Sequence, residues 1–185
     1  MPQPQDEKEL SHFPKKMLGE YYSENDMKEL HITEKLILRI YDFDLKMSIK
    51  DLDSNFIISN DTIYDMESGE FKIFESGSDS ISENIYIIDT LFQISNSNIL
   101  KKFKGYYFLN IQYESDSWEV KKIEFNRGEL TISKVSTQND LENLKELSES
   151  ENDDSPYKFK PTKRQFKKFI KQEGFRDKET YKKFQ

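Results

Sequence analysis

The stretch KKFKGYYFLNIQYESDSWEVKKIEFNRGELTISKV, residues 101–135, decides the fold. It predicts three antiparallel strands that follow one another through short turns. The first strand, residues 105–113, carries apolar side chains on both faces: Tyr107, Leu109, Ile111 and Tyr113 on one, Tyr106 and Phe108 on the other. Apolar residues on both faces are typical of a strand in the middle of a sheet.

The second strand of this stretch changes the parity of its apolar residues. Trp118 and Val120 share one parity, while Ile123 and Phe125 share the other. If all four face one core, an extra residue is needed, so we expect a β-bulge near Lys121 and Lys122. The residues 126–128, Asn-Arg-Gly, then predict a hairpin turn with a positive φ at the glycine, and Leu130 and Ile132 begin the return strand.

Alternating apolar residues predict further strands on the N-terminal side of this stretch. They cover residues 13–22, 31–41, 43–49, 56–59, 62–66, 70–75 and 84–94, and a helical turn is expected at residues 99–104. The fold class is therefore mainly β, an antiparallel barrel or curved sandwich of about eight to ten strands with C-terminal α-helices.

Two helices are expected after residue 135. Thr137 and Asp140 have capping-box spacing, and Leu141, Leu144 and Leu147 follow on one face. A second helix begins at Thr162 with Gln165 in the matching position, and it presents Phe166, Phe169 and Ile170 as a stripe. We expect this stripe to pack on the β domain; a partner groove or a membrane surface is the alternative. Asp177 is expected to cap a last turn that presents Tyr181 and Phe184.

These elements divide the chain into four parts. Residues 1–12 are polar and contain proline, which predicts a tether. Residues 13–148 form one β-rich domain that ends in a short helix. Residues 149–156 form an acidic linker, and residues 157–185 form a basic helical segment packed on the β domain.

Composition limits the chemistry. The chain has 185 residues, which predicts one compact domain, and 14% of the residues are aromatic, which is more than long disordered chains contain. It contains no cysteine, so disulfides, thiolate catalysis and thiolate metal sites are excluded. No run approaches the roughly 18 apolar residues that a membrane helix needs.

Charge is unevenly distributed along the sequence. Residues 156–185 contain eleven Lys or Arg against three acidic residues, a balance of +8, whereas residues 1–155 carry −15. A basic tail can bind nucleic acid or anionic lipid. The net charge of −7 opposes that interpretation, and we expect the tail to lie against its own acidic body or to be a solvated face.

Sequence patterns predict no catalytic residue, no cofactor site and no metal site. Residues 51–55 begin like a calcium loop, but Phe56 stands where that loop requires glycine. Asp61, Asp65, Glu67 and Glu70 could gather at one hairpin end, yet acidic loops are usually solvated. With only His12 and His31, a histidine-based zinc site and a Ser-His-Asp triad are almost excluded.

Two remaining patterns bear on nucleic-acid binding and on enzyme chemistry, and neither predicts a site. Lys101, Lys102 and Lys104 beside Phe103, Tyr106 and Tyr107 resemble a nucleic-acid surface, but these aromatic residues alternate as core residues do, so we predict no nucleic-acid partner. Hydrolysis by a pair of carboxylates needs only two placed acids, and the sequence selects no pair among 35.

Several of these segments carry a family resemblance. The polar N-terminus, the F-P-x-x-x-x-G-x-Y-Y opening at residues 13–22, the strand motifs of residues 105–133 and the final P-T-K-R-Q-F-K-K-F-I helix resemble small uncharacterised lipoproteins of Bacteroidetes. The resemblance implies export and a lipid anchor on a cysteine that this sequence lacks. A weaker resemblance, to lipocalin-type β-barrels, rests on Gly19-Glu20-Tyr21 in place of a G-x-W motif and implies carriage of a small apolar ligand.

The predicted function is a non-enzymatic binding or interaction protein of a bacterial cell envelope, periplasmic or on the outer membrane, with a protein partner. The alternatives are a small apolar-ligand carrier and an acidic immunity or inhibitor protein against a basic toxin. Met1 fits two interpretations. Either it replaces a removed signal peptide, or it is the native start of a cytoplasmic protein.

Overall fold

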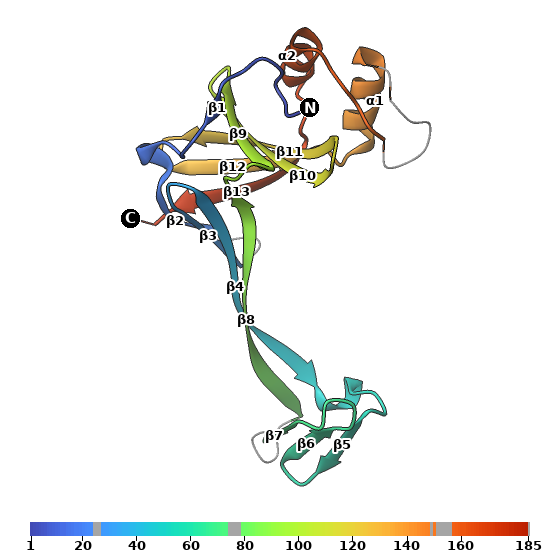
Figure 1. Cartoon of the computed structure of the whole chain (residues 1–185). Helices are drawn as coiled ribbons and strands as arrows, with labels where there is room; N and C mark the ends of the chain where they lie inside the picture. Colours follow the sequence, from blue (N-terminus) through green and yellow to red (C-terminus); the bar gives the residue numbers. More distant parts are fainter. Residues whose placement is uncertain (24–26, 74–78, 149, 151–156, 185) are drawn as a thin grey trace. The chain divides into compact units, whose positions relative to one another are not determined.

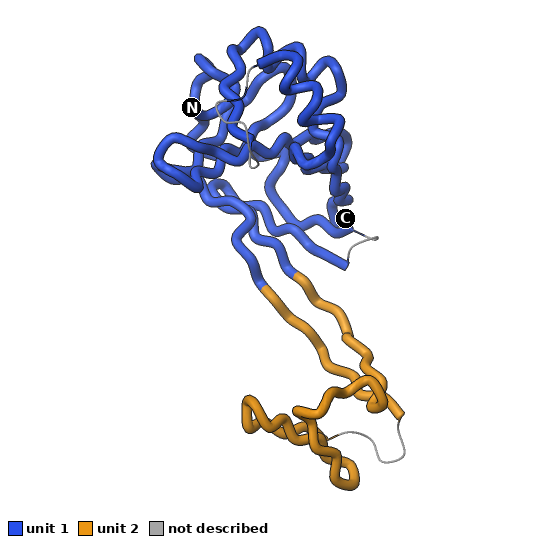
Figure 2. Tube along the Cα trace, turned by 90° about the vertical axis from the view of Figure 1, so that its right-hand side faces the viewer, with its two compact units in different colours: residues 1–40, 88–185 blue, residues 41–87 orange. Residues whose placement is uncertain are grey.

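A computed structural model describes residues 1–23, 27–73, 79–148, 150 and 157–184. The described part of the chain is mainly β, with two short helices near the C-terminus. It divides into two compact units: unit 1 comprises residues 1–40 and 88–185, and unit 2 comprises residues 41–87 (Figures 1 and 2). The single domain expected for residues 13–148 is therefore interrupted by unit 2.

The strands are β1 (Glu9–Leu10), β2 (Gly19–Ser23), β3 (Lys28–Ile32), β4 (Leu36–Ser48), β5 (Phe56–Ser59), β6 (Thr62–Asp65), β7 (Phe71–Ile73), β8 (Ser80–Gln93), β9 (Asn98–Phe103), β10 (Tyr106–Glu114), β11 (Ser117–Asn126), β12 (Glu129–Lys134) and β13 (Asp177–Lys183). The helices are α1 (Gln138–Leu147) and α2 (Lys163–Lys171), with short 3-10 turns η1 (Lys15–Met17) and η2 (Ile49–Asp51).

Both sheets are antiparallel, and the fold is sandwich-like, which confirms the predicted class. Ten strands form one sheet in the order β1-β9-β10-β11-β12-β13-β2-β3-β4-β8, and β5-β6-β7 form the other. Among the described strands the large sheet ends at β1 and β8, so it is open and the barrel alternative is wrong. The strand number exceeds the prediction because β1, β9 and β13 form in segments predicted as tether or helix.

The three strands predicted from residues 101–135 are confirmed as β10, β11 and β12. On β10, Tyr107 and Leu109 belong to one hydrophobic core, while Phe108 is fully buried in a second core on the other face. The turn between β11 and β12 has Arg127 at φ 48° and Gly128 at φ 85°. Two positive φ values define the two-residue turn that suits the twist of a hairpin.

The predicted bulge at Lys121 and Lys122 is wrong. Pairing between β10 and β11 is continuous from Tyr107↔Ile123 to Gln112↔Trp118, and the register shifts only near the turn, between Gln112 and Glu114. No bulge is needed because both faces of β11 are covered. Ile123 packs in the first core, whereas Val120 packs against the second.

Two segments predicted as helical are strands. Residues 99–104 were expected to form a helical turn, but β9 pairs with β10 and buries Leu100 in the first core. Residues 177–183 form β13 between β12 and β2, with Tyr181 fully buried, so the final helical turn is wrong. Pairing with β12 and β2 decides the structure of this segment. Of the described residues in the predicted helical segment 157–185, only those of α2 form an α-helix.

The N-terminal residues are not a tether. Strand β1 pairs with β9, and Gln3 is 5% exposed. The Gln3 amide donates to Asn110 Oδ1 at 2.6 Å, Asn110 Nδ2 donates to the Gln3 carbonyl at 2.9 Å, and Lys101 Nζ donates to the Pro4 carbonyl at 3.0 Å. Burial lowers the pKa of Lys101. The segment is ordered because buried Asn110 and Lys101 require hydrogen-bond partners.

Both predicted helix starts are confirmed. Thr137 Oγ1 accepts the amide of Asp140 at 3.2 Å, and Thr162 and Gln165 form a full capping box at α2. The Phe166 ring lies 5.2 Å from that of Phe108, so the α2 stripe packs on the sheet as predicted. The acidic linker falls outside the described residues except for Ser150, which forms a β-bridge with Phe159.

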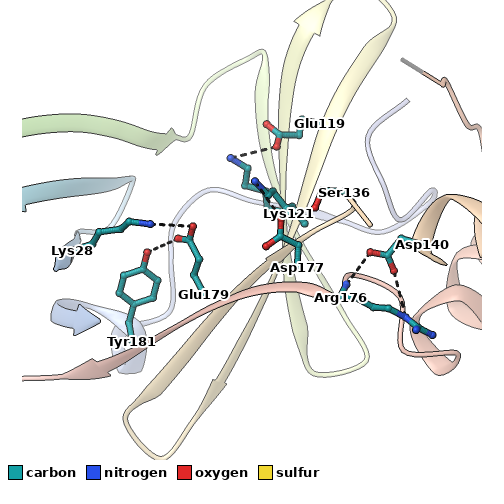
Figure 3. A network of polar contacts seen from close by, with 10 residues as sticks. Lys28, Glu119, Lys121, Ser136, Asp140, Arg176, Asp177, Glu179 and Tyr181 are labelled. Atoms are coloured by element: carbon teal, nitrogen blue, oxygen red, sulfur yellow. Dashed lines mark hydrogen bonds and ion pairs between the residues drawn. The ribbon is translucent and has the colours of Figure 1, made fainter. Parts of the chain in front are cut away.

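Strand β13 is also held by polar contacts (Figure 3). Asp177 Oδ2 accepts from Ser136 Oγ at 2.5 Å and lies 3.4 Å from Lys134 Nζ. The Ser136 hydroxyl is the main cause of a lowered pKa of Asp177. Burial acts to raise the pKa of the Glu179 carboxyl. The hydrogen bond from the Tyr181 hydroxyl and the positive charge of Lys28 outweigh burial, so the pKa lies below its ordinary value.

Burial of β10 in a hydrophobic core on each of its two faces gives a stability prediction. Replacing Phe108 by alanine leaves a cavity against Phe166 and Phe175, and we expect the free energy of unfolding to fall by about 3 to 5 kcal/mol in urea denaturation. Met27→Ala, at a side chain 67% exposed, is the control and should change it by less than about 0.5 kcal/mol. Equal effects would contradict burial of β10 on both faces.

The Ser136 hydrogen bond gives a pH prediction. Because the folded pKa of Asp177 lies below its ordinary value of 3.8, the bond stabilises the protein above that pH. This stabilisation is lost as the pH falls through the folded pKa. Ser136→Ala should therefore be less stable than the wild type at neutral pH, and the difference should shrink under acidic conditions. Exposed Ser82→Ala is the control, and a difference independent of pH would contradict this assignment.

Candidate functional site

Unit 2 has few buried apolar side chains. Among the described residues, only Ile63 and Ile81 of this unit belong to the buried hydrophobic set. Large hydrophobic side chains with exposed fractions between 37% and 71% are far more numerous there: Leu45, Met47, Ile57, Ile58, Tyr64, Met66, Phe71, Ile73, Tyr86 and Ile87. Contiguous exposed apolar surface on a protein marks a binding site more often than scattered single residues do.

The small sheet aligns four of these side chains on one face. Strand pairing places Ile57 opposite Tyr64 and Tyr64 opposite Phe71, and Ile73 follows Phe71 by two residues. Directly opposed residues and residues two apart share a face of an antiparallel sheet. We call Ile57, Tyr64, Phe71 and Ile73 the apolar face. Their exposed fractions are 50%, 46%, 64% and 71%.

Local sequence explains why this sheet forms. The predicted strand at residues 56–59 is confirmed as β5, and those at residues 62–66 and 70–75 contain β6 and β7. Asn60 at φ 55° and Gly69 at φ 72° provide the turns. The Asp65 carboxylate accepts from the Ser68 hydroxyl at 2.8 Å and from the Glu67 amide at 2.8 Å, which lowers the pKa of Asp65.

Strand β4 shows where the sequence pattern misleads. Residues 43–49 alternate apolar and polar side chains, which predicted a half-buried strand. In the structure Leu45 is 41% exposed and Met47 is 37% exposed. On the polar side of this strand, Asn84 Nδ2 donates to Asp42 at 3.0 Å and to Asp44 at 3.2 Å. The apolar side of the alternation is therefore available for contact with another molecule.

Unit 2 carries the negative charge of the protein. Residues 41–87 contain eleven Asp or Glu against three Lys, a formal charge of −8, compared with −7 for the whole chain. Of the three lysines, Lys72 forms an ion pair with Glu83. Asp61 lies in the turn between β5 and β6, while Glu67 and Glu70 lie in the turn between β6 and β7. Acidic residues thus flank the apolar face at both ends.

Of the four acidic residues considered as metal ligands, Asp65, Glu67 and Glu70 lie at the turn between β6 and β7, and only Asp61 lies at the other end of β6. Asp61 is separated from Glu67 and Glu70 by the length of β6, because successive turns of an antiparallel sheet lie at opposite ends. Within the described residues, no group of three or more His, Asp or Glu side chains is arranged to hold a metal ion. In the calcium-like stretch, Asp53 Oδ1 accepts the amide of Asn55 at 2.9 Å.

The other residues considered from sequence lie apart in unit 1. His12 is hydrogen-bonded to Ser11, and His31 on β3 lies 3.5 Å from Glu29. Of the basic and aromatic group, Phe103, Tyr107 and Lys101 are buried. The basic C-terminal segment contacts its own unit through Lys158 with Glu114 at 2.5 Å and Lys163 with Glu7 at 2.8 Å, as predicted for a tail lying against its own body.

No family model, curated protein or solved structure matches this chain. Across the described residues, no helix has the length and apolar character needed to cross a membrane. The resemblances to lipoproteins and to lipocalins therefore stay predictions. The apolar face was missed at the sequence level, although the excess of acidic residues over lysine in residues 41–87 is visible in the sequence.

Proposed function

We propose that this chain is a non-enzymatic protein-binding protein and that unit 2 is its binding part. The partner is a protein with a basic surface that contains apolar side chains. The observation that carries the proposal is the exposure of Ile57, Tyr64, Phe71 and Ile73 on one face of an acidic sheet.

The apolar face supplies affinity in this proposal. Full burial of an Ile, Phe or similar side chain contributes about 1.5 to 3 kcal/mol, and these four are about half exposed or more, so a partner recovers a large part of that energy at each. Tyr64 stands in the middle of the cross-strand row between Ile57 and Phe71. Aromatic residues near the centre of a patch are the usual energetic hot spots of protein interfaces.

The charge of unit 2 supplies selectivity. A second copy of the same unit would bring another −8 to the interface, and like charges disfavour that association. A basic partner is attracted instead, and such steering accelerates association at low ionic strength. An inhibitor or immunity protein for a basic toxin is one member of this class of proteins, and the acidic charge of unit 2 favours it.

Site-specific photo-crosslinking tests the location of the binding surface. p-Benzoylphenylalanine in place of Phe71 should crosslink a basic protein in the native cell, and the same group in place of Met27 of unit 1 should not. Met27 is a matched control because it is 67% exposed, against 64% for Phe71. Equal crosslinking at both positions, or a crosslink from Phe71 only to a second copy of the chain, would overturn the proposal.

Binding measurements with the purified crosslinked partner test its chemistry. Phe71→Ser should weaken the affinity by at least about tenfold, as loss of an interface aromatic does, and the affinity should fall with added salt. Met27→Ser is the control and should bind like the wild type. An affinity that neither Phe71→Ser nor salt changes would show that another surface binds the partner.

Location in the cell envelope and attachment by a lipid also belong to the proposal, and they rest on the resemblance to lipoproteins. Intact mass and N-terminal chemistry of the protein from its native cell test this part. An acylated cysteine ahead of Pro2 would support it. An unmodified N-terminus in the soluble fraction would refute it, and a basic partner in the cytoplasm would then be sought.

A further inference from the structure

Unit 1 contains a cavity of about 660 Å³, a size typical of small-molecule sites. Strand β11, both helices and residues 157–161 line it, and all of its lining residues belong to unit 1. It is therefore separate from the apolar face of unit 2. The cavity arises where the second core ends: Phe166, Phe169 and Phe175 are almost fully buried and also line it.

The chemistry of the walls favours a neutral, apolar molecule. Apart from the second-core phenylalanines, Trp118, Val120 and Leu141 contribute to the lining. The charged lining residues are balanced, two acidic residues against two lysines, and Lys158 is already paired with Glu114 at 2.5 Å. A charged ligand would lose its hydration without a net opposite charge to compensate for the loss.

Two polar atoms of the lining residues have no hydrogen-bond partner among the described residues. They are Nε1 of Trp118, which can only donate, and Oε1 of Gln3, which can only accept. The Gln3 residue is 5% exposed, and its main chain is fixed by Asn110. Both atoms have under 1 Å² of accessible surface, so a ligand bonds to them only once the Gln3 and Trp118 side chains turn toward the cavity. Buried polar groups in folded proteins are nearly always satisfied, so an unmet donor and an unmet acceptor on lining residues favour a ligand that carries both.

The walls of the cavity are held in place independently of any ligand. Asp140 at the start of α1 is fully buried and accepts the amide of Arg176 at 3.0 Å, next to Phe175 (Figure 3). Gln165 Nε2 of α2 donates to the Leu147 carbonyl at the end of α1. A site fixed in advance loses less entropy on binding.

From this geometry we infer that the cavity binds a neutral, largely apolar small molecule with a hydroxyl or amide group. Such a group donates one hydrogen bond and accepts one, as Gln3 Oε1 and Trp118 Nε1 require. This activity is additional to protein binding by unit 2. Neither site shares a residue with the other.

N-Phenyl-1-naphthylamine, a neutral apolar dye, tests the inference on the full chain. Trp118 is the only tryptophan in the sequence and lines the cavity, so energy transfer from it to the dye reports binding to this chain, and the variants locate the bound dye. Val120→Phe fills the cavity and should weaken binding by at least about tenfold. Phe71→Ser in unit 2 should leave binding unchanged. Leu141→Phe fills the cavity from α1 and serves if Val120→Phe does not fold.

The polar part of the inference is tested by competition. 1-Naphthol should displace the dye at a concentration at least about fivefold lower than naphthalene, which lacks the hydroxyl group. Gln3→Leu removes the acceptor but keeps the main-chain bonds to Asn110, and it should abolish that difference. Dye binding that is lost in Phe71→Ser and kept in both cavity-filling variants would overturn the inference, as would equal competition by the two naphthalenes.

Discussion

Strand β10 imposes the constraint on which unit 1 depends. Its side chains are apolar on both faces, so the sheet needs a cover on each side. The first core covers Tyr107 and Leu109, and α2 with Phe175 covers Phe108. The second cover depends on the capped helix starts at Thr137 and Thr162 and on the buried carboxylate of Asp140. The cavity is the part of it that the side chains leave unfilled.

Unit 2 differs from unit 1 because most of its large apolar side chains are exposed. Ile63 and Ile81 are its only buried large hydrophobic side chains among the described residues, and its apolar face is open. Such exposure is costly for a protein that acts alone, because it promotes non-specific association. The charge of −8 opposes self-association. In the proposed function, the open apolar face and the acidic charge of this unit together bind a basic protein.

The sequence predicts the positions of most strands, turns and helix starts, but it does not predict which strands pair at long range or which apolar side chains stay exposed. The meander, both helix caps and the two-faced burial of β10 follow from periodicity and turn chemistry over short distances. It failed where long-range pairing decides: Asp177–Lys183 becomes a strand because β12 and β2 lie on either side. The exposure of unit 2 was missed because alternation, as in Phe43, Leu45 and Met47 of β4, indicates that one side of a strand is apolar, without indicating whether this chain or another molecule covers it.

Hydroxyl-radical footprinting in the native cell tests the central claim most directly. Tyr64 and Met66 of unit 2 are 46% and 60% exposed, and Met27 of unit 1 is 67% exposed. Our account predicts that Tyr64 and Met66 are oxidised more slowly in the cell than in the purified protein, while Met27 is oxidised equally in both. Equal oxidation of Tyr64 and Met66 in the two settings would contradict it, because the face would then be open where the protein acts.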